Sequence, residues 1–341
     1  MSTATTAAGP PEHNITGIDF GQRGHLRYAG PPLLDIHSHV TLTGPGDSAH
    51  PAGSLAQAET MLDVATEFHV GRIYTMCPPE HIAPLRERFG ARLGFNGSIL
   101  KHRLDSPDDE AYQLLDHFLA AGIEIVKFWA APRGRDRGLF VDAPWRVEAA
   151  QRAIAAGVRV FMVHVGDPDA WFRTVYADRA KFGTKADQYT GLIRLLTTFP
   201  EVNWIGAHMG GDVEHPDYLE ALLERFPHLC FDTSATKWQV REVSSRTDAI
   251  RSLMCRYPNR FLFGTDLVTR PGLPREHYIS RYWCQRTLWE SHWTGRSPIA
   301  DPDFLAEAGG PTTPPLHGID LPAEVLELVY HGNAERLLAG R

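Results

Sequence analysis

The chain has 341 residues, of which 43% are hydrophobic, and a net charge of −7 from 34 basic and 41 acidic residues. A chain of this length and composition can bury a large core, either in one large domain or in two ordinary ones. The acidic balance and the absence of a long basic run argue against nucleic acid as a partner. No apolar stretch approaches the roughly 18 to 20 residues that cross a bilayer, so no membrane association is expected.

The N-terminus and the cysteines indicate the cellular compartment. Residues 1–11 are rich in Ala and Thr and lack the charged and apolar regions of a secretory signal. The four cysteines are widely scattered, with no Cys-x-x-Cys pair and no dense disulfide spacing. We therefore expect a reduced, cytoplasmic enzyme.

Short apolar runs alternate with longer amphipathic stretches along the chain. The runs are rich in Val, Ile, Phe and Leu, which is typical of strands that are covered on both faces. Several amphipathic stretches end at Gly or Pro, as helices do. Eight runs alternating with helices predict an α/β fold, namely a (β/α)8 TIM barrel. The expected strands are 33–39, 72–77, 93–99, 123–129, 158–165, 202–208, 229–234 and 261–266, and the clearest expected helices are 54–68, 108–121, 143–156, 189–199, 218–226 and 247–257.

Two segments depart from a minimal barrel. Residues 1–31 are interpreted as an N-terminal extension, and residues 32–341 as the barrel domain. Within that domain, residues 271–320 form an insertion after the eighth strand that is rich in proline and tryptophan. Long ordered excursions at a barrel mouth often serve as lids or subunit contacts. The insertion therefore predicts a lid or an oligomerisation element, and a homo-oligomer is expected.

Polar side chains stand at the ends of several expected strands. His37 and His39 end the first strand, His164 lies at the end of the fifth, His208 ends the sixth and Asp266 ends the eighth. The C-terminal strand ends of such a barrel converge on one mouth, so these side chains would be neighbours. Strand residues i and i+2 point to the same side, so both imidazoles of the first strand can reach one ion. Metal coordination would offset the cost of burying these polar groups.

A structural role competes with the metal role for each residue taken alone. A single histidine at a strand end is more often a hydrogen-bonded structural residue than a ligand, and Asp266 could cap a helix. Lys127 in the fourth strand could extend its ammonium to solvent or pair with a carboxylate. Asp35 shares a face with His37, which favours a hydrogen bond to the ligand imidazole. Because the histidines recur at several strand ends, the metal site is the preferred interpretation.

At these motifs the chain resembles the amidohydrolase superfamily. The similarity is greatest to the amidohydrolase-related (amidohydrolase 2) branch, which also contains the aminocarboxymuconate-semialdehyde decarboxylase-like enzymes. The resemblance covers roughly residues 32–338. As an ordered set the motifs are specific to the superfamily and not to one reaction. They are residues 34–39 in the first strand, 163–164 in the fifth, 206–211 in the sixth, 263–266 in the eighth and 331–338 in the closing helix.

The resemblance implies a set of metal ligands, which are His37, His39, His164 and Asp266. In single-metal members the residue at His208 hydrogen-bonds the activated water or the substrate. In two-metal members it binds a second ion, and Lys127 stands near the place of the bridging residue. Imidazole and carboxylate ligands suit Zn²⁺, and the ligand types are also compatible with Mn²⁺ and Fe²⁺. We expect one divalent ion, zinc, with a two-metal site through Lys127 and His208 as the alternative.

These residues suit hydrolysis. A bound ion lowers the pKa of a water ligand toward about 7. Asp266 can accept the proton of that water and pass it to the leaving group, while the ion and His208 stabilise the oxyanion. The expected reaction is hydrolysis of an amide, ester or lactone of a small carboxylated substrate. Metal-dependent non-oxidative decarboxylation of an aromatic or muconate-like acid is the alternative. A third possibility, a catalytically inert barrel that binds a small molecule or a partner, would require an incomplete ligand set.

Substrate-facing groups are expected in the loops after the strands. Arginine in these loops favours planar oxyanions, which agrees with a carboxylated substrate. Solvent exposure or packing is the competing explanation for each of these residues. The principal candidates are Arg133, Trp171, Arg173, Lys237 and Arg270, and the further candidates are Arg135, Tyr176, Ser234 and Trp238.

Overall fold

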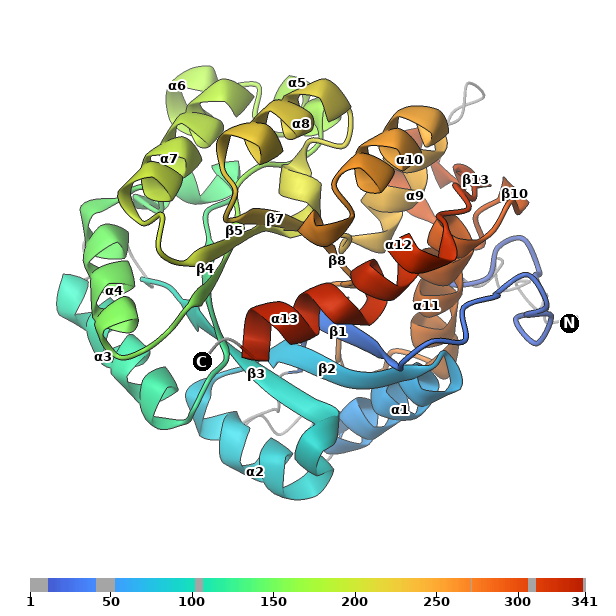
Figure 1. Cartoon of the computed structure of the whole chain (residues 1–341), viewed down its shortest axis with the longest axis horizontal. Helices are drawn as coiled ribbons and strands as arrows, with labels where there is room; N and C mark the ends of the chain where they lie inside the picture. Colours follow the sequence, from blue (N-terminus) through green and yellow to red (C-terminus); the bar gives the residue numbers. More distant parts are fainter. Residues whose placement is uncertain (1–11, 41–52, 102–106, 271, 306–310, 340–341) are drawn as a thin grey trace, which may run out of the picture.

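A curled parallel sheet surrounded by helices forms the molecule (Figure 1). The computed structural model describes residues 12–40, 53–101, 107–270, 272–305 and 311–339. The predicted TIM-barrel architecture is confirmed. All its central strands run parallel, in the order β8-β7-β6-β5-β4-β3-β2-β1-β9. Their bounds are β1 (Leu33–His39), β2 (Val70–Met76), β3 (Leu93–Ile99), β4 (Ile125–Trp129), β5 (Val160–His164), β6 (Asn203–Gly206), β7 (Leu229–Asp232), β8 (Phe261–Leu262) and β9 (Leu267–Val268).

The two ends of the sheet meet because β8 covers the start of the eighth predicted strand, residues 261–266, and β9 directly follows that predicted strand. The strand β8 pairs with β7, and β9 pairs with β1. Two backbone hydrogen bonds join β1 to the segment between β8 and β9, from Ile36 N to Phe263 O at 3.0 Å and from Asp266 N to His37 O at 2.8 Å. Asp266 adopts a left-handed backbone, with φ of 59°, which interrupts the strand at the residue expected to bind metal. Such strain in a residue other than glycine is typical of functional sites.

Strand alternation separates two hydrophobic cores. Met162 and Ile205 belong to the smaller core inside the barrel. Their chain neighbours Phe161 and Trp204 face the outer helices, and their rings stack with centroids 4.9 Å apart. Alternate residues thus point to opposite faces, as the strand period requires, and both faces are covered.

The closing helix blocks one end of the barrel. Ala334 and Leu337 of α13 (Asn333–Ala339) belong to the inner core, and Asn333 Nδ2 donates to Phe261 O, where β8 begins, at 2.8 Å. Figure 1 shows α13 lying across the strands at this end. It follows a short helix, α12 (Ala323–Glu327), and a π-helical turn (Leu328–Gly332). The C-terminal strand ends, at the opposite end, are therefore the place left for a site.

Ten helices precede the insertion in the described part of the chain, and most follow a strand. They are α1 (Gly53–Glu67), α2 (Pro79–Phe89), α3 (Asp108–Ala120), α4 (Pro144–Ala155), α5 (Asp169–Arg173), α6 (Arg179–Phe182), α7 (Lys185–Thr198), α8 (Pro216–Arg225), α9 (Thr236–Ser244) and α10 (Thr247–Arg256). Among the described residues, no helix combines the length and the apolar character that a membrane span needs.

The insertion after the eighth strand contributes a wall helix. Helix α11 (Arg275–Glu290) is buried along most of its length and packs against α1 and α9. Two small antiparallel sheets of two strands each follow it, one of β10 (Thr294–Arg296) with β13 (Pro315–His317) and one of β11 (Asp301–Leu305) with β12 (Pro311–Thr312). The described part of the N-terminal extension lies on the same helix, where Tyr28 N donates to Glu290 at 2.6 Å. The role of residues 271–320 as a lid or subunit contact stays a prediction.

Candidate metal and active site

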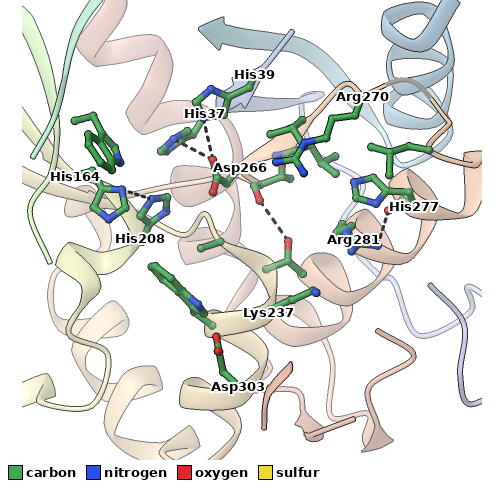
Figure 2. Close-up of a pocket in the computed structure, with 18 of the residues that line it drawn as sticks. His37, His39, His164, His208, Lys237, Asp266, Arg270, His277, Arg281 and Asp303 are labelled. Carbon is green, nitrogen blue, oxygen red and sulfur yellow. Dashed lines mark hydrogen bonds and ion pairs between the residues drawn. The ribbon is translucent and has the colours of Figure 1, made fainter. Parts of the chain in front are cut away.

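A cavity of about 900 Å³ opens at the C-terminal ends of the strands (Figure 2). Strand ends and the segments that follow them supply most of its lining, and α11 completes one wall. The structure thus brings most of the predicted site residues, but not Arg133 and Arg173, to one cavity. Those that line it are His37, His39, Lys127, His164, Trp171, His208, Lys237, Asp266 and Arg270.

Three of the four predicted metal ligands form a tight cluster. Asp266 Oδ1 lies 3.4 Å from His37 Nε2 and 3.1 Å from His39 Nε2. One ligand atom from each residue can be chosen so that all three atoms lie within 4.8 Å of one another. Burial opposes ionisation of Asp266, but the hydrogen bond with His39 and the neighbouring imidazoles of His37 and His208 hold its pKa well below its usual value. Two imidazoles and an ionised carboxylate form a donor set that suits a divalent cation.

Asp232, which sequence reasoning did not single out, orients His37. It ends β7 and is fully buried, and its Oδ2 lies 2.8 Å from His37 Nδ1. Burial alone would raise the pKa of this carboxyl, but His37, His208 and Lys127 lower it below the usual range. An ionised Asp232 holds the proton of His37 on Nδ1, which leaves the Nε2 lone pair for an ion. The available signal was its position as a further polar residue at a strand end.

Lys127 places a cationic group beside the same cluster. Its Nζ lies 3.2 Å from His37 Nε2, and the side chain is buried. Burial lowers the pKa of Lys127 to about 8, although the carboxylates of Asp232 and Asp266 oppose that shift. The imidazole and carboxylate groups of the cluster therefore already lie beside a positive charge, as they would beside a divalent ion. The predicted alternative role of Lys127 in a two-metal site stays a prediction.

His208 lies between the cluster and His164. The rings of His37 and His208 stack with centroids 4.9 Å apart, and His208 Nε2 is 3.3 Å from His164 Nδ1. The other nitrogen of His208, Nδ1, contacts Ser234 Oγ at 2.7 Å. Burial, followed by the charge of His164, lowers the pKa of His208 well below 6.5, so its ring is neutral at physiological pH. His37, His208 and Asp232 also form a group of possible ligands within 4.8 Å, which agrees with the two-metal alternative.

His164 is not part of the cluster of His37, His39 and Asp266. Its Nδ1 faces His208, and its Nε2 lies 2.8 Å from Asp167 Oδ1. Asp167 is in turn held by the hydroxyl of Tyr176 at 2.6 Å. Both ring nitrogens of His164 therefore have protein partners, and its role as a fourth ligand stays a prediction.

The expectation that Asp35 hydrogen-bonds a ligand imidazole is wrong. Asp35 Oδ1 accepts the backbone N–H of His37 at 3.2 Å and that of Thr265 at 3.1 Å. Its Oδ2 accepts the hydroxyls of Thr265 at 2.6 Å and Tyr282 at 3.1 Å. The carboxyl therefore ties β1 to the turn before Asp266 and to α11, because a buried carboxylate needs several donors.

The predicted substrate-facing residues divide into two groups. Trp171, Lys237 and Arg270 line the cavity, and Trp238 joins them with its ring centroid 5.3 Å from that of Trp171. Arg133 and Arg173 are exposed and do not line it. The guanidinium carbon of Arg133 lies 5.9 Å from the ring centroid of Trp171, which is a lining residue. Their substrate-binding role stays a prediction, and the basic residues that α11 adds to the lining, His277 and Arg281, were missed.

Comparison with solved structures agrees with the observed fold. Solved structures of similar fold include the uncharacterised TIM-barrel protein Bb4693 from Bordetella bronchiseptica, with 16% identity and a TM-score of 0.52 over 91% of this chain and all of that one. The 4-oxalomesaconate hydratase LigJ from Rhodopseudomonas palustris has 13% identity and a TM-score of 0.53 over 90% of this chain and 95% of its own. An amidohydrolase from Burkholderia multivorans has 12% identity and a TM-score of 0.50 over 90% and 99%. At such identities the likeness concerns the fold alone.

No curated protein sequence matches the chain. The sequence model of the amidohydrolase family, in contrast, matches residues 35–340. This range includes His37, His39 and Asp266, which we call the histidine–aspartate cluster. The chain therefore belongs to the amidohydrolase family.

Proposed function

We propose that this amidohydrolase-family enzyme is a metal-dependent hydrolase of an amide, ester or lactone bond in a small carboxylated substrate. The observation that carries the proposal is the convergence of His37, His39 and Asp266 at the mouth of the barrel cavity. The buried pair of Asp232 and His37 supports it, because that pair presents the Nε2 lone pair toward Asp266.

The residues that would hold one divalent ion, which we propose to be zinc, are His37, His39 and Asp266, with His164 as the predicted fourth. Such an ion supplies a Lewis acid that activates water and polarises a carbonyl group. Asp266, ionised at neutral pH, can accept a proton from the attacking water and return it to the leaving group. The neutral His208 ring can donate a hydrogen bond to the oxygen on which negative charge develops.

Non-oxidative decarboxylation is the second candidate, and one feature of the backbone favours it. The sixth-strand motif shared with the decarboxylase-containing branch forms a tight turn in which His208, Met209 and Gly210 have φ of 58°, 51° and 71°. This turn brings His208 into the cavity beside Asp266, and Asp266, once it has accepted a proton from water, could deliver that proton to carbon as CO₂ leaves. The same constellation can therefore serve either reaction.

A product assay on zinc-loaded protein separates the two reactions. A panel of esters, lactones and amides with a second carboxylate is incubated beside aromatic and muconate-like acids, and release of acid and of CO₂ is measured. Hydrolysis predicts acid release that is lost in Asp266→Asn, a variant of nearly equal size. Protein that binds no stoichiometric metal and gains no activity from Zn²⁺ or Mn²⁺ would contradict the proposal, and CO₂ release alone would favour the second candidate.

Two further expectations belong to the proposal. The four cysteines are free thiols, which supports a reduced, cytoplasmic setting. We also propose a homo-oligomer, and light scattering during size-exclusion chromatography of the full chain measures its mass directly.

A further inference from the structure

One wall of the cavity is basic. Figure 2 shows His277, Arg281, Arg270 and Lys237 on the side of the cavity away from His164 and His208. Arg270 follows β9, His277 and Arg281 belong to α11, and Lys237 belongs to α9. The described lining of this wall has two acidic side chains, Glu12 and Asp303. Three permanent cations against two carboxylates leave the wall with an excess of positive charge.

Arg281 is the most unusual member of this wall, because it is buried without a counter-charge. Its exposed fraction is 7%, and no carboxylate among the described residues forms an ion pair with it. Its Nη1 donates to His277 O at 3.2 Å, to Ser280 Oγ at 3.1 Å and to His13 Nδ1 at 2.9 Å. Its Nε and Nη2 have no such partner within the described part of the chain. Burying an arginine in this way is unfavourable unless an anion completes the site.

His277 offers a second unmatched group at the same place. Its Nδ1 is buried and has no hydrogen-bond partner among the described residues. Burial, together with the charges of Arg281, His13, Lys237 and Arg270, lowers the pKa of His277 to about 2, so its ring is neutral at physiological pH. Nearby, the ammonium of Lys237 pairs, among the residues that the structure describes, only with Glu12, at 3.9 Å, and Glu12 is largely exposed. Such groups at the edge of one cavity are a common feature of ligand sites.

We propose that Arg281, together with His277 and Lys237, forms a subsite that binds a carboxylate of the substrate, away from the reacting group. The guanidinium of Arg281 has two neighbouring donors that match the two oxygens of a carboxylate. The substrate would then have an anionic end at α11 and an amide, ester or lactone carbonyl at the histidine–aspartate cluster. The reaction at that second end rests on the proposed function, whereas binding of the anion does not.

Binding of succinate to metal-free full-length protein tests the subsite without any catalysis. Calorimetric titration with succinate, and with neutral succinamide as its counterpart, is performed on the wild type, Arg281→Met and Arg275→Met. Arg275 is an exposed residue of the same helix that pairs with Glu67, so its variant removes the same charge outside the cavity. We expect succinate affinity to fall about 10- to 100-fold in Arg281→Met and to be unchanged in Arg275→Met. Equal succinate affinity in the wild type and Arg281→Met would overturn the subsite.

A second variant guards against misfolding of Arg281→Met. Lys237 is partly exposed, so Lys237→Met should fold, and we expect its succinate affinity to fall by about threefold or more. Unchanged affinity in that variant would remove Lys237 from the proposal, and circular dichroism checks each fold. Once a hydrolysed ester is known, kinetics give a second test. The kcat/KM of Arg281→Met should fall about 10- to 100-fold more on the carboxylated ester than on its neutral analogue. Equal losses of kcat/KM on both esters would also overturn the subsite. If the protein has no hydrolase activity but its succinate binding depends on Arg281, the subsite is supported and the proposed function is rejected.

Discussion

Replacing Asp232 by Asn should weaken metal binding although Asp232 is not one of the predicted ligands. Asp232 Oδ1 accepts the backbone N–H groups of His208 at 2.8 Å and Ser234 at 3.0 Å, whereas Oδ2 lies 2.8 Å from His37 Nδ1. The carbonyl oxygen of an asparagine would have to remain at the Oδ1 position, because both backbone groups there are donors. Its NH₂ group would then face His37 Nδ1.

That substitution should move the proton on the His37 ring from Nδ1 to Nε2. Nδ1 would become the acceptor, so Nε2 would carry the hydrogen and lose the lone pair that faces Asp266. Loss of a carboxylate that orients a histidine ligand typically lowers metal affinity about 10- to 100-fold. That loss corresponds to about 1.4 to 2.8 kcal/mol of binding free energy.

Competition with a chromophoric chelator measures this zinc affinity at constant pH. The matched control is Asp142→Asn, which makes the same change in a surface ion pair with Arg194 and should leave the zinc affinity unaltered. Urea unfolding of the metal-free proteins checks that both variants fold. If Asp232→Asn bound zinc as tightly as the wild type, the orientation of His37 by this carboxylate would be refuted as the basis of the site.

Two further predictions concern Lys127 and the outer core. Burial lowers the pKa of Lys127 to about 8, so this side chain loses its positive charge beside His37 as the pH rises through that value. Zinc affinity should therefore rise between about pH 7 and pH 9, and the rise should be smaller in Lys127→Met; identical pH profiles by chelator competition would contradict this. Trp204 is fully buried against Phe161, and its Nε1 donates to Phe199 O at 3.2 Å. Trp204→Ala should lower the free energy of unfolding in urea by about 3 to 5 kcal/mol, and a loss below about 1 kcal/mol would show that this contact does not hold the outer helices.

The strand ends could be predicted from the sequence because barrel topology converts chain order into position. His37 and His39 end a strand, and Asp266 interrupts the last one, so their meeting follows once eight parallel strands are accepted. Asp232 was missed because the run that contains it continues through polar residues, which hid the end of β7. Asp232 could have been found by treating each polar residue near the end of an expected strand as a candidate.

Contacts of loops and of the insertion could not be predicted in this way. Arg281 lies in a stretch whose helical pattern does not show which side packs inward, and its place in the cavity depends on how α11 packs between α1 and α9. Arg133 and Arg173 were chosen by sequence position alone, and both are exposed, Arg133 in a 3-10 helix (Pro132–Arg137) and Arg173 at the end of α5. Local sequence defines the elements, whereas the direction of a loop side chain is decided by tertiary packing.

The metal content of purified protein after dialysis against zinc and then against metal-free buffer tests the central claim most directly. Elemental analysis of the wild type, His39→Ala and Asp266→Ala should find about one ion per wild-type chain, and about a tenth of that or less in each variant, because each variant removes one donor of a three-residue cluster. A wild-type protein that retains no zinc, or variants that retain as much zinc as the wild type, would contradict the assignment of this cluster as the metal site.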